Sequence, residues 1–145
     1  MKNQLAIVAT ASMLWLLSCS NEPTCNFEGS WSVEPRIESS ILSKTIVSIA
    51  EEDYRSSVYR FEKEGKMYID RRAEGSTSQQ EATWQFDPAT QQLSWKGVSG
   101  QPAELNETFE VKSCSADTIV LFQRLPPEPD KEEVAKVTLT LARMK

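Results

Sequence analysis

Few side chains of this 145-residue sequence could carry out covalent or acid–base chemistry. It contains three cysteines, 21 acidic residues and no histidine. The lack of histidine removes the commonest general base, the Ser-His-Asp arrangement and most zinc and copper sites. A phosphate-cradling glycine loop, a calcium loop of alternating aspartates and a serine three positions before a lysine in a nucleophile setting are also missing from the sequence.

Paired carboxylates are the remaining route to catalysis, because a glycosidase needs only two of them in suitable environments. The acidic residues gather at positions 51–53 and 130–133, and we expect both runs to be solvated surface. We therefore predict that the protein is not an enzyme and that it holds no cofactor and no metal.

The N-terminal segment accounts for the first cysteine. Lys2 precedes an apolar run over residues 5–17, which has the layout of an export signal and is too short to span a membrane as a helix. Leucine three positions before Cys19 and serine one position before it resemble the lipobox of bacterial lipoproteins. The resemblance implies a signal peptide over 1–18, several acyl chains such as palmitate on Cys19, and a lipidated tether over 19–26 that attaches lastingly to a membrane.

Ser20, rather than an aspartate, follows this cysteine, which in such lipoproteins favours the outer membrane, facing the periplasm or the surface. Two alternatives stay open. One is an ordinary cleaved secretory signal in which Cys19 is incidental, and the other is an N-terminal membrane helix.

With Cys19 assigned to lipid, Cys25 and Cys114 remain as a pair in an exported, oxidising setting. We expect them to form a disulfide that joins the segment after the anchor to a strand near the C-terminal end. The alternative is two unrelated thiols.

Removal of residues 1–18 leaves 127 residues, which suffice for one domain with a modest core, over 27–145. These 127 residues carry 21 acidic and 15 basic side chains. Nucleic acid and anionic lipid both attract a surplus of lysine and arginine, so neither is expected as a partner. The lipid anchor, and not charge, would make the membrane contact.

Short segments in which apolar and polar residues alternate predict strands with one face on a core. Eight follow one another, and seven of them place alternate apolar residues on one face: Trp31 and Val33, Tyr59 and Phe61, Met67 and Ile69 (or Tyr68 alone), Trp84 and Phe86, Leu93 and Trp95, Phe109 and Val111, and Val137, Leu139 and Leu141. The seventh strand in order, with the run Ile119 to Phe122, is apolar on both faces and is predicted to be central or covered. The run Asp87-Pro88-Ala89-Thr90 predicts a turn between the fourth and fifth strands. Eight antiparallel strands remove their edges by closing into a barrel or by pairing as a flattened β-sandwich.

Residues 36–53 fit strand alternation poorly and place apolar side chains near helical spacing. We predict one short amphipathic helix here, after the first strand, with its apolar side formed by Ile37, Ile41, Leu42, Ile46, Ile49 and Ala50. The polar residues 75–80 and the proline-rich residues 125–133 are predicted to be loops. Asn106-Glu107-Thr108 is interpreted as the entry to a strand.

The Gly29-Ser30-Trp31 sequence at the start of the first strand resembles the Gly-x-Trp pattern of the lipocalins. The run from Tyr59 to Lys66, the tryptophan strand at Trp84 and the order of the later strands resemble small bacterial lipocalin-like lipoproteins over residues 27–145. The resemblance implies an eight-stranded lipocalin-like barrel whose floor is closed by Trp31, beneath an arginine of the last strand, for which Arg143 is suitably placed.

The aromatic side chains have two interpretations, because an eight-stranded barrel is either filled by its inward side chains or leaves room for one small ligand. The candidate lining, as pocket or as core, comprises Trp31, Tyr59, Phe61, Met67, Ile69, Trp84, Phe86, Trp95 and Phe109. A pocket of this kind suits a fatty acid or another apolar molecule. Arg60, Arg71 and Arg72 could meet a carboxylate at its mouth, but we expect them to be exposed.

Two functions follow from these interpretations. The first is a membrane-anchored, non-catalytic carrier of a small hydrophobic ligand. The second is a protein-binding lipoprotein with a filled barrel, in an inhibitor, immunity or envelope-assembly role. A packed interior combined with a contiguous exposed apolar patch would favour the second.

Overall fold

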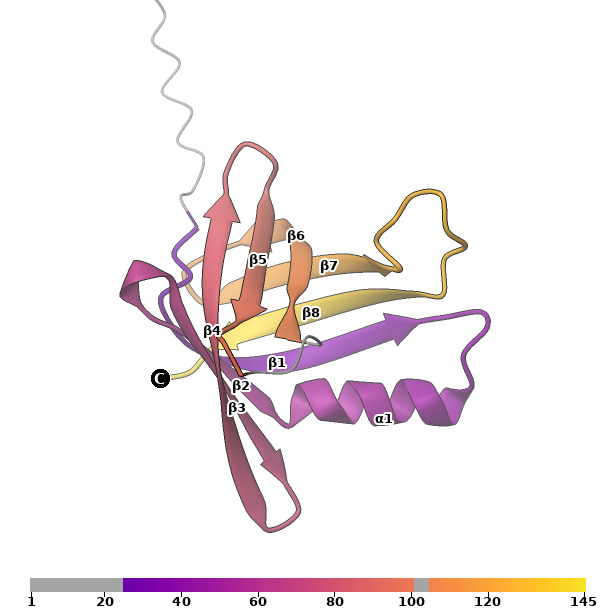
Figure 1. The fold of residues 1–145 in the computed structure, drawn as a ribbon, viewed down its shortest axis with the longest axis horizontal. Coiled ribbons are helices and arrows are strands. Elements are labelled where there is room, and N and C mark those ends of the chain that lie inside the picture. The colour runs from indigo at the N-terminus through magenta and orange to yellow at the C-terminus, as the bar shows by residue number, and fades with distance from the viewer. Residues whose placement is uncertain (1–24, 101–104) are drawn as a thin grey trace, which may run out of the picture.

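The structure, a computed structural model that describes residues 25–100 and 105–145, is a closed antiparallel barrel with one α-helix after its first strand (Figure 1). The elements in chain order are β1 (Gly29–Glu38), α1 (Lys44–Arg55), β2 (Ser57–Phe61), a 3₁₀ turn (Lys63–Gly65), β3 (Lys66–Ala73), β4 (Ser76–Asp87), β5 (Gln92–Gly97), β6 (Glu107–Cys114), β7 (Thr118–Leu125) and β8 (Ala135–Arg143). The predicted fold class is confirmed. The signal peptide, Cys19 and most of the predicted tether lie outside the described residues.

Each strand of the barrel pairs with its neighbours in the sequence, and the last strand closes on the first. The closing ladder between β1 and β8 runs from Trp31 opposite Arg143 to Glu38 opposite Lys136. β7 and β8 are also paired along their whole lengths, from Thr118 opposite Ala142 to Leu125 opposite Ala135. Closure removes most of the edge that an open sheet would expose.

The core follows the predicted period of two. Alternate residues of every strand point inward, because successive side chains of a strand lie on opposite faces. The largest side chains that are almost fully buried are Trp31, Trp95, Phe61, Phe109, Met67, Ile69, Leu93, Ile119, Leu121, Leu139, Leu141 and Val137. The turn predicted after β4 is also present, with the Asp87 carboxylate accepting from the backbone N–H of Ala89 at 2.9 Å.

The predicted bounds of the helix are wrong. β1 continues to Glu38, and α1 begins only at Lys44, after the side chain of Ser43 caps it by accepting from the N–H of Ile46. The side of α1 that faces the barrel carries Val47, Ala50, Glu51 and Tyr54, which are half-buried at helical spacing. Ile46 and Ile49, assigned to the inner side, point outward instead, and Ile41 is exposed in the loop before the helix. Ile37 belongs to β1, from which it packs against the core. No residue of α1 is fully buried.

The prediction of a loop over residues 75–80 is also wrong. β4 begins at Ser76 and pairs with β3 from Ala73 opposite Ser76 to Lys66 opposite Thr83. Residues 76–79 are exposed on both faces, so they lack the apolar alternation by which a strand is identified in a sequence. In Figure 1 this hairpin between β3 and β4 stands away from the rest of the barrel at the bottom of the view.

One gap in the barrel wall lies beside β1. β2 pairs with β1 only from Gly29 to Ser32, so among the described residues no strand lies on that side of β1 from Val33 onward, where α1 covers it. Pro35 lies in this part of the strand, where its missing N–H leaves no donor unpaired. The N–H of Ile37, two residues further on, is satisfied by a carboxylate oxygen of Glu51 from the helix at 2.8 Å.

Candidate functional site

The interior of the barrel is a packed aromatic and aliphatic core. Trp31, Tyr59, Phe61, Met67, Ile69, Trp95 and Phe109, seven of the nine predicted pocket-or-core residues, are each at most 2% exposed. Tyr59 and Trp95 contact each other edge-on at 5.4 Å between ring centroids, and Trp95 stacks on Phe109 at 5.1 Å. A void of the size of a water molecule would leave accessible area on the side chains that line it, so these residues fill the space between them.

Trp84 and Phe86, the other two of the nine, are half-buried and surround a plug at one end of the barrel. The plug is Phe27, which precedes β1 and is 2% exposed. Its ring lies 5.0 Å from that of Phe86, 5.7 Å from that of Trp84 and 6.1 Å from that of Phe61. Sequence reasoning missed Phe27 because it stands before the first strand, outside any alternating segment.

Three contacts hold the plug in place. Cys25 and Cys114 form the predicted disulfide, with 5.7 Å between their Cα atoms. The indole N–H of Trp31 donates to the carbonyl oxygen of Phe27 at 2.7 Å. The guanidinium of Arg143, as the lipocalin resemblance predicts, lies over the Trp31 ring at 4.2 Å.

Arg143 also ties together three chain segments at this end. Its guanidinium donates to the carbonyl oxygens of Ala116 at 2.6 Å, Glu28 at 2.7 Å and Asn26 at 3.1 Å. Lysine could not make these contacts, because it lacks the planar fork of donors that arginine presents. These contacts close this end of the barrel.

A half-buried polar cluster lies against the core, where α1 ends and β6 begins. The hydroxyl of Tyr54 donates to the Glu107 carboxylate at 3.0 Å. Burial raises the pKa of Glu107, while the Tyr54 hydroxyl, the Trp95 indole and the charge of Arg71 partly oppose that rise. Burial likewise raises the pKa of Tyr54 and, well above its usual value, that of Tyr59.

The Trp95 indole N–H lies near this carboxylate, yet it makes no hydrogen bond of acceptable geometry within the described residues. Glu107 begins β6 as predicted for its tripeptide, but its inward direction was missed. The signal was present, because Glu107 is in phase with Phe109 and Val111 at a period of two. The Glu107 carboxylate is thus held by a tyrosine hydroxyl from α1.

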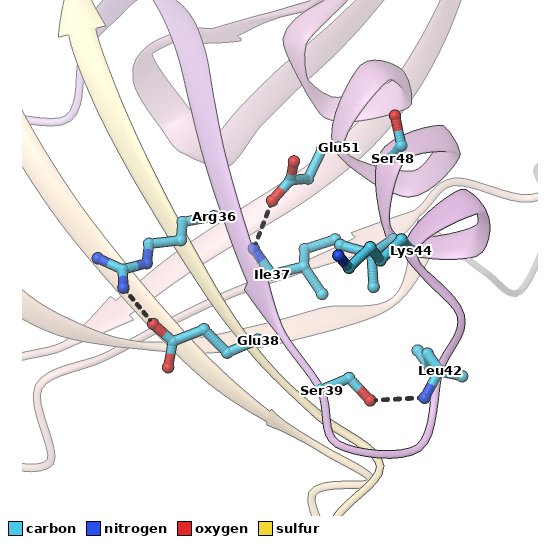
Figure 2. Close-up of a pocket in the computed structure, with 9 residues that line it drawn as sticks. Arg36, Ile37, Glu38, Ser39, Leu42, Lys44, Ser48 and Glu51 are labelled. Carbon is cyan, nitrogen blue, oxygen red and sulfur yellow. Dashed lines mark hydrogen bonds and ion pairs between the residues drawn. The ribbon is translucent and has the colours of Figure 1, made fainter.

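An open groove of about 520 Å³ lies between the end of β1 and the first turns of α1. Figure 2 shows the Glu51 carboxylate reaching from the helix to the Ile37 N–H, and the Arg36–Glu38 ion pair at 2.7 Å on the strand side. The expectation that residues 51–53 are all solvated surface is therefore wrong for Glu51, which is half-buried. The groove is polar and shallow, and it does not reach the core residues named above.

The outer side of α1 and the loop before it expose three large apolar side chains. Ile41, Ile46 and Ile49 are 57%, 52% and 60% exposed, respectively. Ile46 and Ile49 are three residues apart in the helix and therefore lie next to each other. We call these three residues the isoleucine patch.

The remaining candidate residues are surface residues. Arg71 and Arg72 are exposed as expected, and Arg60 lies outside the barrel with its guanidinium 4.6 Å from the Tyr68 ring. Glu133, in the second acidic run, pairs with Arg124 at 3.0 Å. Among the described residues, no group of three or more cysteine, aspartate or glutamate side chains could hold a metal ion.

None of the helices within residues 25–100 and 105–145 has the length and apolarity that crossing a bilayer requires. The chain matches no family model, and no curated protein is significantly similar to it in sequence.

Proposed function

We propose that this protein is a lipid-anchored, non-catalytic protein-binding module of the bacterial cell envelope, in which the barrel is a solid scaffold. The observation that carries the proposal is the distribution of apolar side chains. Seven of the nine candidate lining residues are at most 2% exposed, whereas the isoleucine patch is exposed on α1 and the loop before it. Ile46 and Ile49 lie next to each other on the helix, and exposed apolar surface of this kind is typical of contact sites for other proteins.

The chemistry of the patch defines the kind of partner. Isoleucine offers dispersion contacts and no hydrogen bond, so the partner surface would present apolar side chains that are desolvated on contact. The surrounding exposed residues of the helix include Glu52 and Asp53, which favour a partner with basic residues at the rim.

Site-specific photo-crosslinking tests the patch. A benzophenone amino acid placed at Ile49 in the full chain, in intact cells, should give a discrete adduct that is also obtained from Ile46. The same label at Lys96, an exposed side chain of β5, should not give it. Identical adducts from all three positions, or no adduct from either isoleucine, would contradict the proposal.

The anchor is tested by fractionation. Replacement of Cys19 by alanine should move the protein from the membrane to the soluble fraction, because the acyl chains would be lost. The double variant Cys25→Ser/Cys114→Ser, which removes the disulfide and not the acylated thiol, should remain with the membrane. If Cys19→Ala leaves the fractionation unchanged, lipidation is refuted.

A carrier of a small apolar ligand is the second candidate, and the observation that favours it is a closed eight-stranded barrel lined by apolar side chains. Here the barrel would have to open to admit its ligand. Native mass spectrometry of the detergent-extracted protein would reveal a co-purifying lipid, and fatty acids would quench the tryptophan fluorescence. A positive result in both would displace the scaffold proposal.

A further inference from the structure

The hairpin between β3 and β4 leaves one strand edge without a partner strand. β4 pairs with β5 only from Ala82 opposite Gly97 onward, and the last backbone bond on that side joins the Val98 N–H to the Glu81 carbonyl at 3.1 Å. Within residues 25–100 and 105–145, β3 is the only strand beside β4 over residues 76–80. We call residues 76–80 the β4 edge.

Alternation fixes which backbone groups point away from β3. Along a strand, the N–H and C=O groups of one residue point to one neighbour and those of the next residue point to the other. The Glu81 carbonyl points toward the β5 side, so the groups of Thr77 and Gln79 point the same way. The β4 edge therefore presents two donors and two acceptors in the spacing that an added antiparallel strand requires.

The strand edge beside β1 is protected, and the β4 edge is not. Beside β1, the helix α1 covers the edge, Pro35 removes one donor and Glu51 satisfies the next. Proteins usually protect edges with such devices, or with charged residues and proline. The β4 edge consists of Ser, Thr, Ser, Gln and Gln, with no charge and no proline, and its residues from 76 to 79 are exposed.

We propose that two copies of this chain associate by antiparallel pairing of their β4 edges, around a two-fold axis at Ser78. In that register Thr77 faces the partner's Gln79 and exchanges two backbone hydrogen bonds with it, and symmetry supplies two more. Ser78 faces the partner's Ser78 as a pair without backbone bonds. An isologous contact of this kind closes the assembly at two copies.

The composition of the β4 edge favours a second copy as its occupant. Self-pairing places only serine, threonine and glutamine opposite one another, so no like charges meet, and hydroxyl pairs across strands are favourable. The hairpin stands clear of the barrel, which gives the second copy room to approach (Figure 1). The isoleucine patch has no part in this contact, so loss of the pairing is distinguishable from loss of partner binding, whereas the strength of the pairing rests on the lipid anchor of the proposed function.

The contact between two β4 edges is small, so the association is weak. Five residues on each side bury less than the ~1,200 Å² of a stable interface, so the association in dilute solution is weak. Confinement of many copies to one membrane raises their effective concentration and shifts the equilibrium toward pairs. The association therefore has to be measured on the full chain in its membrane.

Cysteine substitution tests the register. A Ser78→Cys variant places the two Cα atoms about 4.5 Å apart across the axis, at the short limit for a disulfide. Thr77→Cys and Gln79→Cys each place their own copies about 8 Å apart, beyond the ~7 Å that a disulfide can bridge. On mild oxidation, the first variant should give at least ~5-fold more dimer on a non-reducing gel than either of the other two.

The chain without an added cysteine gives the background from its own thiols, and circular dichroism verifies that each variant is folded. In the Ser78→Cys chain, Thr77→Lys together with Gln79→Lys places lysine opposite lysine and should abolish the dimer. Gln85→Lys, on the part of β4 that pairs with β5, should leave it unchanged. Absence of the Ser78→Cys dimer, equal cross-linking at positions 77–79, or indifference to the two lysines would overturn the proposal.

Discussion

The central carbon of the Arg143 guanidinium lies over the Trp31 ring at 4.2 Å from the ring centroid, while the guanidinium nitrogens donate to three backbone carbonyls. The two residues face each other across the β1–β8 ladder that closes the barrel. One side chain thus joins the first strand, the last strand and the segment before the first strand. Closure of the barrel and placement of the Phe27 plug therefore both depend on this side chain.

Replacement of Arg143 by lysine should destabilise the barrel, although the charge is kept. An ammonium group reaches one of the three carbonyls and leaves the others to solvent, so we expect a loss of about 1 to 3 kcal/mol in the free energy of unfolding. Urea denaturation measures the change. Arg72→Lys, at an exposed position on β3, is the control and should differ from the parent chain by less than ~0.5 kcal/mol.

Gly29→Ala should be more damaging than alanine at another glycine of similar backbone freedom. Gly29 has φ +126°, and a Cβ there would lie 2.6 Å from Nη1 of Arg143, so we expect a loss of at least about 2 kcal/mol. Gly75, with φ +72° and open space around it, provides the matched comparison, at about 1 kcal/mol for alanine. If alanine at Gly29 and alanine at Gly75 lower the free energy of unfolding equally, the contact of the new Cβ with Arg143 has no energetic cost.

Loss of the disulfide should destabilise the domain without unfolding its strands at neutral pH and low temperature. Cys25 and Cys114 are 89 residues apart, and closure of a loop of that length contributes roughly 4 to 5 kcal/mol by chain entropy, as an upper limit. The double variant Cys25→Ser/Cys114→Ser should show that loss in urea denaturation. A reductant should lower the stability of the parent chain and leave the double variant unaffected.

The Glu107 carboxyl predicts a pH dependence of definite sign. Its folded-state pKa is raised above the usual 4.5, so the folded state holds the proton more tightly than the unfolded state. Its contribution to stability is therefore fully present below about pH 4.5 and is lost as the pH rises through the folded-state value. Stability should fall in that range as the carboxyl ionises.

Glu107→Gln should remove this slope, because the amide does not ionise and its carbonyl oxygen still accepts from Tyr54. Urea midpoints measured from pH 4 to pH 8 test the difference between the variant and the parent chain. Glu110→Gln, on the outer face of β6, should keep the slope of the parent chain. A slope that is unchanged in Glu107→Gln would assign the pH dependence to another group.

Sequence patterning predicted the parts of the fold that contact the core. Trp84, Phe86, Leu93 and Trp95 alternate with polar residues because their strands have one face on the interior, and proline after Asp87 identified the turn between them. The alternation and the turn are local, so a window of a few residues contains them. The Cys25–Cys114 disulfide spans 89 residues and is predicted differently, by elimination, because Cys19 is expected to carry lipid and an exported domain is in an oxidising setting.

Features that depend on contacts between segments far apart in the sequence were not predicted. Residues 76–79 form a strand because β3 supplies their hydrogen bonds, and no apolar side chain records that pairing. The isoleucines of α1 match an inward-facing pattern, but the inner side of the helix is fixed by Glu51, which satisfies the β1 edge, and by Tyr54, which bonds Glu107. In both cases a polar interaction between distant segments determines the local structure, and the spacing of apolar residues in the sequence does not reveal that interaction.

The covalent link between Cys25 and Cys114 also determines how the domain bears a mechanical load. If the chain is held on its N-terminal side and drawn through Lys145, tension passes at Cys25 directly to Cys114 and bypasses the 88 residues between them. Strands β1 to β6, which lie between the two cysteines, carry no tension along their own backbone. The load falls on β7 and β8 alone, so force can extract those two strands while the looped remainder stays slack until the sulfur–sulfur bond is reduced.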